Sequence, residues 1–97
     1  MLTSKQRSQL TGIASRDCVA QALGKFGLTD AAIAQIDGLL GHHELVKIKF
    51  LDFKDEKREI AEELASRTHA ELVRVIGNSA ILFRQNPNPE KRQIELV

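Results

Sequence analysis

The organisation of this chain is clearest in residues 18–30, which read CVAQALGKFGLTD. The first six residues are mostly apolar, and the shortness of this run and the glycine that ends it favour a buried strand. A loop framed by Gly24 and Gly27 follows at once. Thr29 can then cap a helix whose first turn holds Asp30, because the positive end of the helix dipole favours a negative charge there. The segment therefore predicts a strand, a glycine loop and a helix in direct succession.

Helical patterns lie on both sides of the glycine loop. Upstream, residues 4–14 carry apolar side chains at spacings of three and four, and Ser4 is a suitable N-cap. Downstream of the loop, apolar residues recur at helical spacing until Gly41. Each helix presents one apolar stripe, so we expect both to cover a sheet.

Residues 45–51 alternate cleanly between apolar and polar side chains. Three apolar side chains share one face, and Lys47 and Lys49 share the other. This alternation is typical of a strand with one buried face. The two lysines either extend a binding surface or keep the exposed face soluble, and the pattern leaves both readings open.

The rest of the chain predicts one more helix and a hairpin. Residues 55–68 place an apolar stripe on a charged surface, as an amphipathic helix does. Residues 71–76 and 80–84 read as strands around Gly77-Asn78-Ser79, a hairpin signal. Residues 85–97 contain two prolines and read as a turn or an extended tail. Whether their final apolar side chains form a short strand stays open.

The predicted order of elements is α-β-α-β-α-β-β. Strands separated by helices favour parallel neighbours joined by right-handed crossovers, and the final hairpin adds an antiparallel strand. We therefore expect an α/β fold, a compact sandwich in which helices cover a mixed four-stranded sheet. The 97 residues leave room for one domain, spanning 1–97.

Composition excludes several classes of protein. A hydrophobic share of 42% and a charged share of 28% suit a small folded domain. A net charge of +1 excludes a histone-like polycation, and the single cysteine excludes an internal disulfide and a multi-cysteine zinc site. No apolar run approaches the roughly 20 residues of a membrane span, and no signal-peptide stretch is recognisable. We expect a soluble, cytoplasmic protein.

The glycine loop, Gly24-Lys25-Phe26-Gly27, is the strongest candidate for a binding site. A loop that leads into a helix N-terminus presents backbone N–H groups and the positive end of a dipole. Glycines let a phosphate backbone approach closely, Lys25 adds charge, and Phe26 can stack on a base. KH domains clamp nucleic acid with a loop of this spacing. The same spacing also suits a plain strand-to-helix turn.

The near-neutral total hides an uneven distribution of charge. Residues 1–25 carry four bases and one acid, whereas residues 52–67 carry six acids and four bases. A basic end suits phosphate, and Lys5 and Arg7 widen its footprint if the first helix docks near the glycine loop. The acidic helix suits water or a protein partner.

The sequence offers little for catalysis or metal binding. His42 and His43 are adjacent at a helix end, so they point in different directions, and no third ligand stands at metal spacing. Cys18 opens an apolar strand with nothing nearby to activate it, which favours a buried structural thiol. No Walker loop, Rossmann fingerprint or paired-carboxylate site is present. We expect no enzyme, no metal, no cofactor and no small-molecule substrate.

The chain as a whole resembles the CRM domain family, named for chloroplast RNA splicing and ribosome maturation, and within it the stand-alone bacterial YhbY-like branch. The resemblance spans nearly all of the chain, and the combination of motifs is far more specific than the glycine loop alone. It is carried by LTSKQR at 2–7, LGKFGLT at 23–29, ID at 36–37, HHELVKIK at 42–49, VIG at 75–77 and ILFR at 81–84.

The resemblance implies a fold similar to the C-terminal domain of initiation factor three and a role in RNA binding. Stand-alone bacterial members associate with precursors of the large ribosomal subunit and assist its assembly. By this analogy the residues of the glycine loop contact RNA backbone, with basic side chains around them, and residues 42–45 form a helix-to-strand junction. Family members are usually clearly basic, so a net charge of +1 implies few phosphate contacts and therefore weak, salt-sensitive binding.

The alternative is a protein-interaction module of a ribosomal or translational complex. It would act through the acidic helix near Glu59, Glu62 and Glu63. This hypothesis predicts partner binding that does not depend on RNA or on Lys25. The leading hypothesis instead has ribosomal RNA of the large-subunit precursor as the partner, and neither hypothesis involves a membrane.

Overall fold

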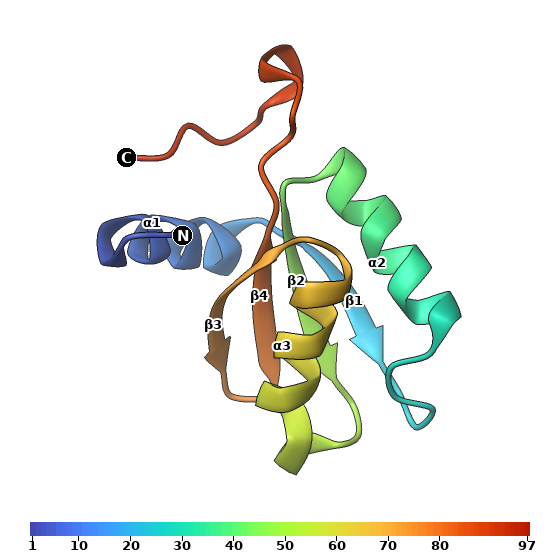
Figure 1. The fold of residues 1–97 in the computed structure, drawn as a ribbon. Coiled ribbons are helices and arrows are strands. Elements are labelled where there is room, and N and C mark those ends of the chain that lie inside the picture. Colours follow the sequence, from blue (N-terminus) through green and yellow to red (C-terminus); the bar gives the residue numbers. More distant parts are fainter.

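A computed structural model describes residues 1–97 and arranges their elements in the predicted order (Figure 1). The α/β order α-β-α-β-α-β-β is confirmed, and two short 3₁₀ turns are added to it. The elements are α1 Ser4–Arg16, β1 Val19–Leu23, α2 Asp30–His42, β2 Leu45–Phe50, the 3₁₀ turn η1 Lys54–Glu56, α3 Lys57–Arg67, β3 Glu71–Ile76, β4 Ser79–Phe83 and the 3₁₀ turn η2 Pro89–Lys91.

The strands form one four-stranded sheet in the order β1-β2-β4-β3. β1 lies parallel to β2, and β4 lies antiparallel to both β2 and β3. The predicted mixed sheet is therefore confirmed, with β1 and β3 at its edges. The hairpin turn is shorter than predicted, because β4 already begins at Ser79. Gly77 takes a φ of 56°, a left-handed conformation that favours glycine.

Helices cover the sheet from both sides. α2 and α3 pack on one face, over a cluster of 11 buried residues that includes Ile48, Phe50 and Leu82. α1 packs on the other face, over a cluster of 7 buried residues that includes Leu10 and Ile81. The layers are thus helices, sheet and a single helix, as the apolar stripes of the three helices predict.

α1 covers only part of its face. Leu45 and Ile81 are buried beneath it, whereas Ala22 and Lys49, which pair with each other further along the same face, are exposed. The uncovered part lies at the end of the sheet where β1 leads into the glycine loop (Figure 1). This end of the sheet is accessible to a ligand.

Residues 85–97 turn back toward α1 after β4 (Figure 1). Their anchor is Glu44, whose side chain is 2% exposed just before β2. The side chains of Ile94 and Leu96 pack against the buried cluster under α1. The Glu44 carboxylate accepts hydrogen bonds from the backbone amides of Asn86 at 2.7 Å, Gln93 at 2.6 Å and Ile94 at 2.9 Å. The segment forms no strand, so that alternative is wrong.

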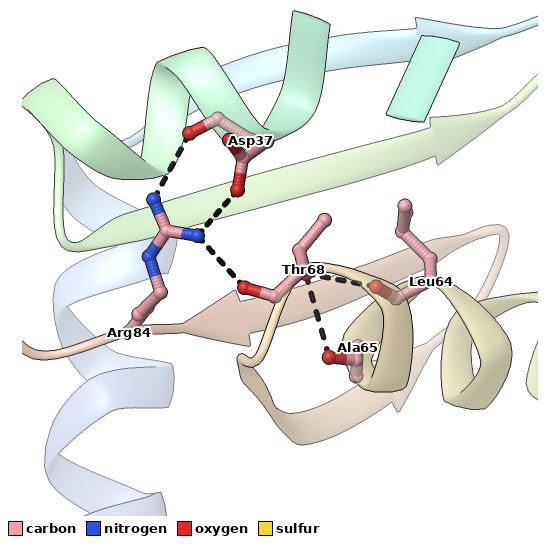
Figure 2. Close-up of polar contacts among 5 residues, drawn as sticks. All are labelled: Asp37, Leu64, Ala65, Thr68 and Arg84. Atoms are coloured by element: carbon pink, nitrogen blue, oxygen red, sulfur yellow. Dashed lines mark hydrogen bonds and ion pairs between the residues drawn. The ribbon is translucent and has the colours of Figure 1, made fainter. Parts of the chain in front are cut away.

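Arg84 ties three elements together directly after β4 (Figure 2). Its Nη1 donates to the Asp37 carboxylate on α2 at 2.6 Å and to the carbonyl of Thr68 at 2.7 Å. Thr68 follows α3, is fully buried, and donates its hydroxyl to the carbonyl of Leu64 at 2.8 Å. Arg84 thereby fixes α2 and the end of α3 to the sheet.

The first and the third helix begin at positions other than those predicted. The N-cap of α1 is Thr3 and not Ser4, because Thr3 and Gln6 form a reciprocal capping box. The helix predicted over residues 55–68 begins as η1. Phe53 precedes it with a φ of 54°, so regular helix cannot extend further back.

Candidate nucleic-acid interface

The glycine loop is a tight turn between β1 and α2. The Gly27 N–H donates to the carbonyl of Gly24 at 3.0 Å, so this amide is used within the turn. Lys25 and Phe26 occupy the tip. Phe26 is 79% exposed, and the Lys25 ammonium lies 5.2 Å from the centre of its ring. The tip therefore offers a cation and an aromatic face together.

The two glycines of the loop are present for different reasons. Gly27 has a φ of 64°, and a Cβ added there would lie 3.2 Å from the ring of Phe53. Both the backbone conformation and the packing therefore favour glycine at position 27. A Cβ at Gly24 would meet nothing within 4 Å, and its φ is ordinary. Nothing within the chain requires glycine at position 24. A larger residue there would therefore affect ligand binding only if a ligand comes close to this position.

Residues 51–53 form a second loop beside the glycine loop. The Leu51 N–H donates to the carbonyl of Leu23 at 2.9 Å and extends the β1–β2 pairing to the start of the glycine loop. Away from the chain ends, four large apolar side chains are exposed, namely Phe26, Leu51, Phe53 and Ile76. Three of them lie in these two loops. Sequence reasoning missed Leu51 and Phe53, although a phenylalanine within a run of charged residues is a usable signal.

The N-terminus of α2 follows the glycine loop closely. Thr29 caps it as predicted, because its hydroxyl oxygen accepts from the Ala32 N–H at 3.1 Å. Asp30 stands in the first turn. The positive end of the α2 dipole therefore lies on the side of the helix that adjoins the loop.

Lys47 and Lys49 lie on the face that α1 covers only in part. Lys49 is exposed and pairs with Ala22 on β1 and with Ser79 on β4. Lys47 is half-buried and lies closer to α1. Strands lie about 4.8 Å apart and rise about 3.3 Å per residue, so the Cα of Lys49 lies within roughly 10 Å of the Cα of Gly24. The structure therefore places Lys49 near the glycine loop.

The structure does not bring Lys5 and Arg7 to the glycine loop. Arg7 Nη1 donates to the carbonyls of Leu72 at 2.6 Å and Val73 at 2.8 Å on β3. β3 is the edge strand opposite β1, and Lys5 is exposed in the first turn of α1. Lys5 and Arg7 therefore do not widen the basic surface around the glycine loop as expected, because the first turn of α1 docks at the far edge of the sheet.

The remaining candidate residues lie away from the glycine loop. Glu59, Glu62 and Glu63 are exposed on α3, where Glu63 forms an ion pair with Arg67 at 3.6 Å. Cys18 is half-buried, and its burial raises the pKa of the thiol, partly opposed by the nearby charge of Lys47. No helix combines the length and the apolar character that a membrane crossing requires.

Comparison with known proteins gives a consistent result. The family model of the CRS1 / YhbY (CRM) domain matches residues 2–84. The chain is 35% identical to the "probable RNA-binding protein YqeI" of Bacillus subtilis over 97 residues, which covers 99% of each chain. It is 33% identical to a "probable RNA-binding protein" of Pseudomonas aeruginosa, covering 93% of this chain and 88% of that one.

A solved structure shares the whole fold. The solution structure of a Staphylococcus aureus protein, described as a candidate RNA-binding protein, superimposes with a TM-score of 0.82. The two chains are 37% identical, and the match covers 100% of each. The agreement includes residues 85–97, which lie beyond the family-model match.

Proposed function

The chain belongs to the CRS1 / YhbY (CRM) domain family, and from this premise we propose that it binds RNA by gripping the backbone with its glycine loop. One observation carries the proposal. The exposed tip formed by Lys25 and Phe26 stands beside Gly24, a glycine that nothing within the fold requires. The RNA-binding names of relatives that match the chain over nearly their full length support it.

The proposed mechanism is binding without bond chemistry, so we propose a protein that is not an enzyme. A phosphate sits near the Lys25 ammonium and the N-terminus of α2, where charge and dipole both favour an anion. The missing side chain of Gly24 lets the RNA backbone come close. Phe26 stacks on a neighbouring base. Lys49 and Lys47 extend the contact across the sheet.

We propose ribosomal RNA of the large-subunit precursor as the partner, with a role in assembling that subunit in the cytoplasm. This part rests on the resemblance to the stand-alone bacterial branch. Lys5 and Arg7 lie at the opposite edge of the sheet, so they contribute only to an RNA long enough to cross the α1 face.

The first test measures binding to structured ribosomal RNA at two salt concentrations. We expect affinity to fall with salt, and Lys25→Glu to weaken it at least about tenfold and flatten the salt dependence, because a phosphate contact is lost. Lys91→Glu is the matched control, since it makes the same charge change at an exposed position of η2. Equal affinity of Lys25→Glu and the parent would refute the assignment of the loop.

The second test uses Gly24→Ala, which adds one methyl group to open space. We expect a several-fold loss of RNA affinity with no change in the melting temperature. Gly38→Ala is the control, because an added Cβ there also meets nothing within 4 Å. Its position inside α2 should only stabilise the helix, by about 1 kcal/mol. Full binding by Gly24→Ala would show that the RNA backbone does not approach this residue.

A protein partner at α3 is the second candidate. It is favoured by Glu59 and Glu62, which are exposed and form no ion pair. Nuclease treatment before gradient sedimentation separates the two proposals. Association that survives the nuclease and is lost on charge reversal of Glu59 and Glu62 would favour the protein partner.

A further inference from the structure

A small pocket lies where α1 meets the uncovered part of the sheet. Its volume is about 170 Å³. Thr11 and Ser15 line it from α1, and Lys47, Ile76 and Ser79 line it from three strands. None of these residues belongs to the glycine loop, so the pocket is a separate feature of the exposed face.

The floor of the pocket is apolar. Ala14 and Ile81 line it, and each is only 3% exposed. Ile76 is 49% exposed at the rim. An apolar floor under a partly open mouth suits a flat, largely apolar ring, because the ring buries its faces and leaves its polar edge to the walls.

The polar groups of the walls have a defined hydrogen-bonding character. The Thr11 hydroxyl donates to the carbonyl of Arg7 at 2.7 Å, and the Ser15 hydroxyl donates to the carbonyl of Gly12 at 2.8 Å. Each hydroxyl has a single hydrogen, so these two oxygens remain available only as acceptors. Lys47 is the charged residue of the lining and can only donate. The pocket therefore offers two acceptors on α1 and one cationic donor, with the Ser79 hydroxyl able to donate or accept.

We propose that this pocket holds one unpaired nucleobase with an exocyclic amino group, adenine or cytosine. The amino group donates to the hydroxyl oxygens of Thr11 and Ser15, and a ring nitrogen or a phosphate oxygen accepts from Lys47. No carboxylate lines the pocket, so its charge complements an anionic chain and not a basic peptide. The inference rests on the proposed function, because the base belongs to the RNA held by the glycine loop.

The route from the glycine loop to the pocket is continuous. The exposed pair of Ala22 and Lys49 lies between them on the same face of the sheet. From strand spacing and rise, the Cα of Lys47 lies roughly 14 Å from that of Gly24. A short single-stranded segment therefore places a backbone group on the loop and a base in the pocket at the same time.

The test is an abasic scan of a short single-stranded ribosomal RNA segment that the parent protein binds. At one position we expect removal of the base to weaken binding about tenfold. At that position, purine riboside, which lacks the amino group, should bind several-fold more weakly than adenosine. Thr11→Val keeps the shape of the side chain and removes one of the two acceptors, so it should reduce this preference for adenosine.

A second variant blocks the pocket on the protein, whereas the abasic scan removes the base from the RNA. Ser15→Phe should weaken binding of the intact RNA about tenfold and make the protein insensitive to the abasic position. Ser66→Phe is the matched control, because Ser66 is also exposed and is also the penultimate residue of its helix, on the opposite face of the sheet. Thermal unfolding establishes that both variants are folded.

The outcomes separate the pocket from the glycine loop. If Ser15→Phe binds like the parent, or if no position of the scan responds, the pocket inference is wrong while an effect of Lys25→Glu keeps the proposed function. If Ser15→Phe weakens every RNA equally and the scan is flat, the pocket contacts backbone and not a base, which also overturns the inference. If the parent binds no RNA, the proposed function fails with it.

Discussion

The two ends of the sheet differ in whether their polar groups are hydrogen-bonded within the chain or exposed to solvent. At the closed end, where β2 begins and β4 ends, the side chains of Glu44 and Arg84 each make three hydrogen bonds within the chain. At the open end, where β1 and β2 finish, the tip of the glycine loop and the side chains of residues 51–54 face solvent. Polar groups satisfied internally stabilise the fold, and groups left exposed are free to bind. We infer that stability and RNA binding are separated along the strands.

The largest expected effect is that of Glu44→Ala at the closed end. The substitution leaves three backbone amides without their acceptor and releases residues 85–97. We expect the free energy of unfolding to fall by about 3 kcal/mol, measured by urea denaturation. RNA affinity should not change. Glu95→Ala is the control, since its side chain is exposed on the same segment. A tenfold loss of RNA affinity in folded Glu44→Ala would contradict the inference that stability and RNA binding depend on opposite ends of the sheet.

Arg84→Ala tests the second contact of the closed end. The guanidinium bridges Asp37 and the carbonyl of Thr68, so its loss should lower the free energy of unfolding by about 1–2 kcal/mol. Arg58→Ala removes an exposed arginine of α3 and should have no measurable effect. If the two variants are equally stable, the bridge contributes nothing and the closed end depends on Glu44 alone.

At the open end, Phe53 holds a strained backbone beside the glycine loop. With a φ of 54°, a residue with a Cβ is destabilised relative to glycine. Phe53→Gly should therefore be more stable than Phe53→Ala by up to about 1 kcal/mol in urea denaturation. Both variants remove the ring from Gly27 and should weaken RNA binding a few-fold. RNA affinity equal to that of the parent would show that the second loop does not support the first.

The smallest expected effect concerns Cys18, between the two ends. Burial raises the pKa of its thiol, so the folded protein favours the neutral form. The stability that this group contributes is fully present below the ordinary cysteine pKa and is lost as pH rises through the raised one. Alkylation with iodoacetamide should be slower at neutral pH than in the denatured chain. An equal rate in both states would contradict this assignment.

Local patterns predicted the fold well. Alternation in residues 45–51 and the Thr29 cap each depend on neighbours a few positions away, and both are confirmed. What escaped prediction depends on distant partners. Glu44 bonds to amides 42 to 50 residues further along, and Arg7 bonds to carbonyls 65 and 66 residues away.

The candidate site shows the same limit. Gly24 and Gly27 are equivalent in a motif, and only the ring of Phe53 and a positive φ distinguish them in three dimensions. The position of Lys5 and Arg7 depended on how α1 docks, and no local pattern specifies docking. The pocket beneath α1 joins residues from one helix and three strands, so no spacing along the chain could reveal it.

The bonds between α1 and the far end of the chain have a consequence for synthesis. Gln6 and Gln9 bond to the backbone of Glu95 and Val97, which are made 86 to 91 residues later. A ribosome adds residues in order at about 5–20 per second, so α1 leaves the exit tunnel seconds before these partners exist. During that interval its apolar face has no complete cover and is open to a chaperone. The hydrogen bonds that tie α1 to residues 95–97 therefore form only after those residues have been translated, which makes the first helix one of the last elements to be secured.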